Sequence, residues 1–146
     1  GDLDPFVRIE LADIDPANVE RGRELFTQSG CSNCHFTKQT GLTDAQMATM
    51  GPYLGNVHNR INPKWIERWL ALPSAVLPYT RMYTPFGMEL DENGNPKVYE
   101  GDTEEDIARY KKSMDDIRAL RDYVLVFGRE AEYKQALEEA KRQARR

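Results

Sequence analysis

The sequence is poor in cysteine and histidine and has no long apolar run. Its 146 residues include two cysteines and two histidines. A zinc site of the paired C-x-x-C type needs a second pair of ligands, and beyond the cysteine motif the chain offers one further histidine, His58. The longest strongly apolar run, residues 123–127, is far shorter than the ~20 residues of a membrane-spanning helix. We therefore expect neither a zinc site nor a transmembrane segment.

Positive charge is not in surplus either. The chain has 20 Lys and Arg against 24 Asp and Glu, a net charge of −4. Residues 129–146 hold six Lys and Arg against four Glu, which leaves 14 basic and 20 acidic residues in residues 1–128. Phosphate binding draws on clustered basic side chains, so this acidic body argues against nucleic acid as the main partner. The length suits one globular domain with short appendages.

The two cysteines lie in Cys31-Ser32-Asn33-Cys34-His35, which matches the C-x-x-C-H signature of covalent haem attachment. Two thiols three residues apart can reach the two vinyl groups along one side of a porphyrin, and the adjacent histidine then lies under the iron. Neutral imidazole is a common ligand of haem iron. We therefore predict one haem c, bonded through Cys31 and Cys34 and ligated by His35.

Two other functions of a cysteine pair fit the sequence less well. A thioredoxin-like dithiol opens a helix after a buried strand, whereas the segment before this motif has a helical pattern. A disulfide across so short a loop would contribute little stability, because its effect grows with loop length.

A helix is predicted from residue 16 to the haem motif. Asp15 is suited to cap it, Pro16 to occupy its first position and Gly30 to end it. This arrangement resembles class I cytochromes c, whose first helix carries a glycine and an aromatic residue before the haem motif, and the resemblance spans roughly residues 15–127. It implies an all-α, class I cytochrome c fold, with helices packed around one covalently bound haem. One face of the helix carries Val19, Gly22 and Phe26.

The segment Gly51-Pro52-Tyr53-Leu54 is similar to the Gly-Pro-x-Leu segment of that family. The resemblance implies that the Pro52 carbonyl accepts a hydrogen bond from His35, which would fix the imidazole plane. It also implies that Arg60 and Trp65 approach the haem propionates, for which guanidinium and indole N–H groups are suitable donors. An ordinary turn at Pro52 and core packing of Trp65 are the simpler alternatives.

Trp65 belongs to a second predicted helix, which begins after its cap Asn62, has Pro63 at its first position and is closed by Pro73. Its pattern gives one broad apolar face, for which core packing is the expected role of the second tryptophan. That face carries Trp65, Ile66, Trp69 and Leu70.

The second axial ligand of the iron is predicted to be Met82. Residues 78–82, Pro-Tyr-Thr-Arg-Met, resemble the Pro-Gly-Thr-x-Met loop that carries the distal methionine of the family. Tyr79 stands where glycine is common, and Tyr83 where proline is usual. Met88 and His58 remain alternatives, and His58 is otherwise a solvent-facing loop residue. The remaining methionines are expected to pack in the interior: Met47, Met50 and Met114.

The rest of the chain predicts an exposed excursion over residues 89–100 and then two helices. Thr103 caps a short first helix, and a second start at Ser113 opens the C-terminal helix, whose apolar stripe is expected to pack on the Gly22 face. Gly128 is expected to break it. The predicted organisation is an N-terminal extension (1–14), a cytochrome c domain (15–128) and a charged helical tail (129–146). A solvated helix is the default for the tail, with a docking surface or a linker as alternatives.

An iron held by both His35 and Met82 has no open position for substrate, so the expected function is one-electron transfer between redox proteins rather than catalysis. The partners would meet the chain through small, transient interfaces. Two alternatives remain, a haem module of a larger redox or sensor complex and a haem enzyme with an open or labile distal site. The resemblance implies a periplasmic or otherwise extracytoplasmic location after removal of a signal segment. Self-association through residues 129–146 is a further hypothesis.

Overall fold

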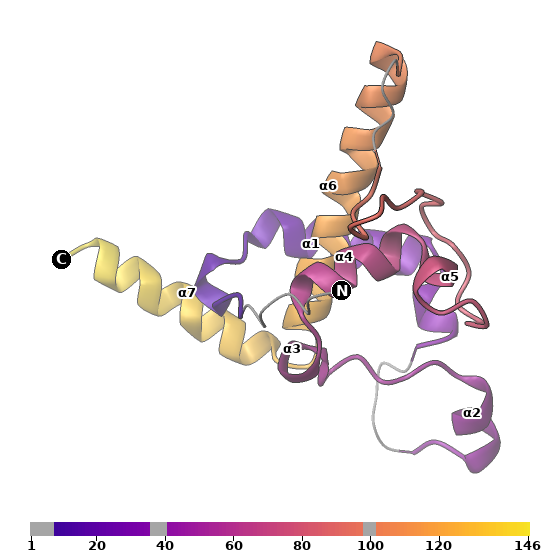
Figure 1. The fold of residues 1–146 in the computed structure, drawn as a ribbon. Coiled ribbons are helices and arrows are strands. Elements are labelled where there is room, and N and C mark those ends of the chain that lie inside the picture. The colour runs from indigo at the N-terminus through magenta and orange to yellow at the C-terminus, as the bar shows by residue number, and fades with distance from the viewer. Residues whose placement is uncertain (1–7, 36–40, 98–101) are drawn as a thin grey trace.

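The computed structural model describes residues 8–35, 41–97 and 102–146 (Figure 1). These residues are largely helical and contain no β-strand, which confirms the all-α prediction. No helix among them is long and apolar enough to cross a bilayer. In chain order the helices are η1 (Leu11–Asp13), α1 (Pro16–Gln28), η2 (Cys31–Asn33), α2 (Asp44–Thr49), α3 (Val57–Arg60), α4 (Pro63–Ala71), α5 (Pro73–Val76), α6 (Glu104–Val126) and α7 (Glu130–Ala144).

Helices α1 and α6 cross at Gly22 and form the centre of the fold. A Cβ atom at Gly22 would lie 2.2 Å from the carbonyl oxygen of Ala119 and 2.6 Å from the Cβ of Tyr123, so glycine is needed for this close approach. One turn further along α1, Phe26 meets the Tyr123 ring edge-on, with 5.4 Å between centroids. The apolar stripe of α6 therefore packs on the face of α1 that carries Gly22, as predicted.

The predicted limits of α1 and α4 are confirmed by their caps. The Asp15 carboxylate accepts a hydrogen bond from the Ala17 amide at 2.9 Å, and the Asn62 side chain accepts one from the Lys64 amide at 3.1 Å. Gly30 follows α1 in the left-handed region, with φ of 71°. These residues fix where the chain enters both helices and where it leaves α1.

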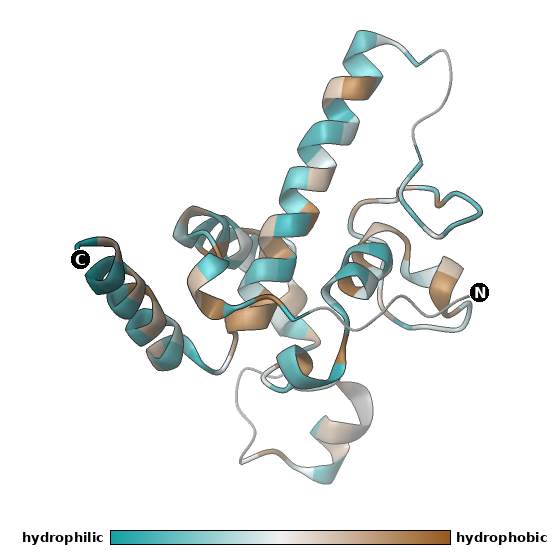
Figure 2. Cartoon of the chain, turned by 60° about the vertical axis from the view of Figure 1, so that its left-hand side comes forward, coloured by the Kyte–Doolittle hydropathy of each residue, from teal (hydrophilic) through white to brown (hydrophobic). Residues whose placement is uncertain are grey.

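Helix α6 is one continuous helix, so the predicted second start at Ser113 is wrong. Thr103 caps it through the Asp106 amide, and no glycine or proline interrupts residues 104–126. Serine inside a helix costs little free energy, which explains why Ser113 does not divide it. The N-terminal part of α6 extends beyond the body with a mostly polar surface (Figure 2). Gly128, with φ of 79°, follows the helix end as expected.

Helix α7 contacts the N-terminal segment at its base and extends away from the body (Figure 1). Tyr133 is 7% exposed and its hydroxyl donates to the carbonyl of Ile14 at 2.6 Å, while Leu137 packs against the core. The expectation of a solvated tail is therefore wrong for the first turns of α7, where these two side chains stand one turn apart. Residues 1–7 of the predicted extension lie outside the described residues.

The segment after the Met82 loop is a folded, half-buried turn rather than a fully exposed excursion. The Asp91 carboxylate accepts hydrogen bonds from two backbone amides of the turn, and Leu90 packs against the core. Gly94 lies against Arg68 of α4, whose Nε would be 3.4 Å from an added Cβ. The contact with α4 therefore keeps part of the segment out of solvent. Residues 98–100 of the predicted excursion lie outside the described residues.

Candidate functional site

The C-x-x-C-H motif forms a single tight turn directly after α1. The amides of Cys34 and His35 both donate to the carbonyl of Cys31, at 3.1 and 2.9 Å. Cys31 is half-buried, Cys34 is exposed, and the two are not joined in a disulfide. The turn thus presents two free thiols and an imidazole from five consecutive residues.

Residues 51–52 are bound to this turn at two points. The Gly51 amide donates to the Cys34 carbonyl at 2.6 Å, and Nδ1 of His35 lies 2.8 Å from the carbonyl oxygen of Pro52. A carbonyl can only accept, so this contact requires a proton on Nδ1, and the tautomer that matches it is the one protonated there. Nε2 then carries a lone pair, the arrangement in which a histidine ligates a metal. This is the contact that the Gly-Pro-x-Leu resemblance implies.

Gly51 leaves the space that the imidazole of His35 occupies. A Cβ at this position would be 2.8 Å from Cε1 and 3.0 Å from Nδ1 of His35. Any larger residue would therefore push the ring away from Pro52. The sequence analysis assigned no separate role to Gly51. Its place directly before Pro52 was the signal that could have predicted its contact with His35.

The loop that carries Met82 lies against the haem motif. The Tyr83 hydroxyl donates to the carbonyl of Ser29, just before the motif, and lies close enough to the Cys31 thiol to affect its pKa. Burial raises the pKa of the Cys31 thiol, an effect that the Tyr83 hydroxyl partly offsets. Burial also raises the pKa of Tyr83. Tyr83, which stands where proline is usual in the resembling family, thus connects the methionine loop to Cys31.

Met82 is positioned by α4. Nε1 of Trp69 donates to the Met82 sulfur at 2.9 Å, and Trp65 stacks on Trp69 with 5.1 Å between ring centroids and 13° between planes. The Met82 amide donates to the Thr80 hydroxyl at 3.2 Å. The sequence interpretation expected Trp69 to be a packing residue, because nothing in a linear pattern shows that its N–H meets a residue 13 positions later.

The other candidate ligands have different surroundings. The amide of Met88 donates to the Ala71 carbonyl at 2.9 Å and its side chain is half-buried against the core. His58 lies in α3, where burial lowers the pKa of its imidazole, with further lowering from the nearby Arg129. It is therefore not a residue of a solvent-facing loop. Arg60 ends the same short helix and is exposed.

The methionines expected to pack in the interior do so unequally. Met114 is 6% exposed and belongs to the core, as predicted. Met47 is 51% exposed on α2, so its assignment as a packing residue is wrong. The sequence analysis predicted no helix in this region and missed α2, whose capping box joins Thr43 and Gln46. The spacing of those two residues was the signal that could have predicted the helix.

The donor set suits an iron porphyrin better than a bare metal ion. Two thiols, an imidazole nitrogen and a thioether are the groups that attach and ligate haem c. Among the described residues, no three His, Cys, Asp or Glu gather as they would around a metal ion. No protein-family model, curated protein or solved structure matches the chain. Its function is therefore inferred from the site itself.

Proposed function

We propose that this chain is a monohaem c-type cytochrome that passes single electrons between redox proteins. Thioether bonds from Cys31 and Cys34 attach the haem, and His35 and Met82 are its axial ligands. The proposed fold is that of class I cytochromes c, in which the α1–α6 crossing supports the haem motif at the end of α1. The proposed location is extracytoplasmic, where haem c is attached in bacteria.

The observation that carries the proposal is the set of contacts around His35. The hydrogen bond from Nδ1 to the Pro52 carbonyl fixes the imidazole plane and directs the proton away from Nε2. Gly51 leaves the space that this ring position requires. An exposed loop histidine has no need of such support, whereas an axial ligand depends on it for its orientation and basicity.

The methionine side of the site supports electron transfer over catalysis. When bound, the haem iron supplies reversible one-electron chemistry between its ferric and ferrous states, and a thioether ligand favours the ferrous state. Trp69 holds the Met82 sulfur through one lone pair and leaves the other for ligation. A haem iron held by both His35 and Met82 would keep no position for substrate.

The surface near Met82 is unusually rich in exposed aromatic side chains. Tyr79 is 82% exposed, Tyr83 49% and Trp65 36%. A porphyrin would cover part of this apolar area, and the Trp65 indole N–H and Arg60 guanidinium are the groups proposed to meet its propionates. The same exposed rim would give redox partners a small and transient contact area.

The proposal is tested by producing the full chain together with a haem c maturation system. We expect the denatured, acid-acetone-extracted protein to keep its colour, to give a pyridine haemochrome spectrum and to carry the added mass of one haem. The double variant Cys31→Ala, Cys34→Ala should have the mass of the bare polypeptide. Ser32→Ala, within the same turn, is the matched control and should retain the haem. A colourless wild-type protein with the bare mass would disprove the proposal.

The methionine assignment is tested in the same material. Met82→Ala should lose the weak absorption band near the red edge that marks iron–thioether bonding, and should gain binding of carbon monoxide. Met88→Ala is the control and should change neither. Binding of carbon monoxide to the untreated wild-type protein would contradict a closed iron site and favour a haem enzyme instead.

A further inference from the structure

The loop that carries the proposed methionine ligand, residues 77–88, is attached to the α4–α5 segment near both of its ends. The Leu77 amide donates to the Pro73 carbonyl at 2.9 Å, and the Met88 amide donates to the Ala71 carbonyl at 2.9 Å. Between these two points the loop contains neither helix nor strand. The position of its centre therefore depends largely on contacts made by side chains.

Two side-chain hydrogen bonds join the centre of this loop to other parts of the fold. On one side, Nε1 of Trp69 in α4 donates to the Met82 sulfur at 2.9 Å. On the other, the Tyr83 hydroxyl donates to the Ser29 carbonyl at 2.5 Å, a contact between residues 54 positions apart in the sequence. Within the described part of the chain, no other residue of the loop forms a hydrogen bond to α1 or to the C-x-x-C-H turn. Tyr83 therefore joins the methionine side of the site to the cysteine side.

The Ser29 carbonyl is a suitable acceptor for this hydrogen bond. Carbonyl groups at the C-terminal end of a helix have no amide donor within the helix and carry its partial negative charge. Ser29 caps the end of α1, where its amide donates to the Leu25 carbonyl at 2.9 Å. Its own carbonyl accepts from Tyr83. Because α1 is held by its close crossing with α6, the hydrogen bond attaches the loop to a fixed point.

Tyr83 stands where proline is usual in the resembling family, and the two residues restrain a chain in different ways. Proline fixes its own φ and so limits the backbone directly after the methionine. Tyrosine leaves that backbone free, but here its side chain binds to α1. The hydrogen bond reduces the number of arrangements open to Met82, one residue away. Preorganisation of this kind strengthens binding by the group that it restrains.

We propose that Tyr83 is a positioning residue that keeps Met82 on the haem iron by holding the methionine loop against the end of α1. The inference rests on the proposed function, in which Met82 is the distal ligand. Without the hydrogen bond the loop opens more often, and the thioether is off the iron for a larger fraction of the time. An external ligand binds in that fraction alone, so Tyr83 sets its apparent affinity.

The test measures imidazole binding to the ferric, haem-loaded full chain at pH 7 by visible absorbance and stopped flow. Imidazole is a ligand of haem iron and competes with the thioether. Tyr83→Phe keeps the ring and removes the hydroxyl. We expect it to bind imidazole about fivefold more tightly than the wild type, the equivalent of one neutral hydrogen bond. The gain should lie in the association rate, with the dissociation rate unchanged, because only the open fraction differs.

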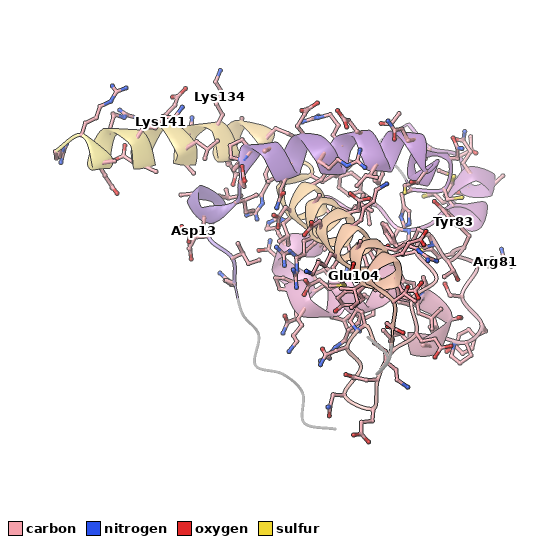
Figure 3. The ribbon with its side chains drawn as sticks, turned by 90° about the horizontal axis from the view of Figure 1, so that it is seen from above. Asp13, Arg81, Tyr83, Glu104, Lys134 and Lys141 are labelled. Carbon is pink, nitrogen blue, oxygen red and sulfur yellow. The ribbon has the colours of Figure 1, made fainter. Side chains whose placement is uncertain are left out.

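Two further tyrosine-to-phenylalanine variants are the matched controls. Tyr79→Phe changes a residue of the same loop that is 82% exposed. Tyr133→Phe removes a hydroxyl that donates to the Ile14 carbonyl at 2.6 Å, and its neighbour Lys134 lies at the opposite end of the molecule from Tyr83 (Figure 3). Both variants should bind imidazole like the wild type. An equal gain in Tyr133→Phe and Tyr83→Phe would assign the effect to general stability and overturn the proposal.

Cleavage by trypsin gives a second readout that does not depend on the iron spectrum. Arg81 is exposed at the edge of the molecule (Figure 3), and cleavage after it requires the loop to open. At a low trypsin concentration, where reclosing is faster than cleavage, Tyr83→Phe should be cut there about fivefold faster than the wild type. Mass spectrometry of the fragments identifies the cleaved bond.

The outcomes separate this proposal from the one on which it rests. Unchanged imidazole binding in coloured Tyr83→Phe protein, or equal cleavage rates after Arg81 in Tyr83→Phe and the wild type, would overturn the role of Tyr83 and leave the proposed cytochrome standing. A colourless wild-type protein with the bare mass would overturn the proposed cytochrome and this inference with it.

Discussion

The hydrogen bond from Trp69 to the Met82 sulfur gives a prediction at the scale of one residue. A donor on a thioether ligand withdraws electron density from the sulfur, which destabilises ferric iron more than ferrous iron and raises the reduction potential. In Trp69→Phe the ring remains and the N–H is lost. We expect the midpoint potential to fall by up to about 40 mV, the one-electron equivalent of a neutral hydrogen bond of about 1 kcal/mol. Spectroelectrochemical titration measures it.

The control for this variant is Tyr79→Phe, which changes an aromatic residue of the Met82 loop that is 82% exposed. Its potential should equal that of the wild type. A potential that rises in Trp69→Phe, or falls equally in both variants, would show that the indole N–H does not act on the thioether.

Single residues of the site differ in how well the sequence predicts them. The contact between His35 and Pro52 could be predicted because a short motif and a dipeptide carry it. The contact between Trp69 and Met82 could not, since it depends on how α4 meets a loop 13 residues later. His58 was considered as an iron ligand or a loop residue, whereas the structure places it in α3, where Arg129 from the start of the C-terminal tail affects its pKa.

At the scale of helices, the α1–α6 crossing gives the sharpest prediction. The methyl group of Gly22→Ala would overlap the backbone of Ala119 and the Cβ of Tyr123, neither of which can rotate away. The two helices must separate, and we expect a loss of about 1–3 kcal/mol or more in the free energy of unfolding. Urea unfolding followed by circular dichroism measures it. Glu24→Ala, on the exposed face of α1, should stay within about 0.5 kcal/mol of the wild type. An unchanged midpoint in Gly22→Ala would contradict the close crossing.

The helices differ in predictability for reasons of length and capping. Helices α1 and α4 have a capping side chain followed by proline, and both starts were predicted correctly. Helix α6 was divided at Ser113 because an acidic cluster after serine looks like a new start, yet the continuous backbone hydrogen bonds of the helix outweigh it. The short helices α2, α3 and α5 were missed because four to six residues hold too few periodic positions to form a pattern.

Across the whole molecule, a network of charged and polar side chains joins helices that are far apart in sequence. Asp122 of α6 is 4% exposed and accepts hydrogen bonds from Asn18 of α1 and from Arg121. Glu67 of α4 accepts from Arg121 and from Arg118. Since a buried carboxylate without partners is costly, this arrangement specifies the relative position of the three helices α1, α4 and α6.

The packing of α7 on the N-terminal segment gives a prediction for the whole chain. Tyr133→Phe removes the hydroxyl that donates to the Ile14 carbonyl and leaves that buried oxygen without its partner. We expect a loss of about 1–3 kcal/mol in the free energy of unfolding, with the helical circular dichroism and, in the proposed haem-loaded protein, the visible absorbance changing in one transition. Thermal unfolding followed by far-ultraviolet circular dichroism and by visible absorbance measures the loss and shows whether the two signals change together. Lys134→Ala, the exposed neighbour, is the control and should change little. If α7 unfolds first and the absorbance midpoint does not move, the tail is an independent appendage rather than part of the cooperative fold.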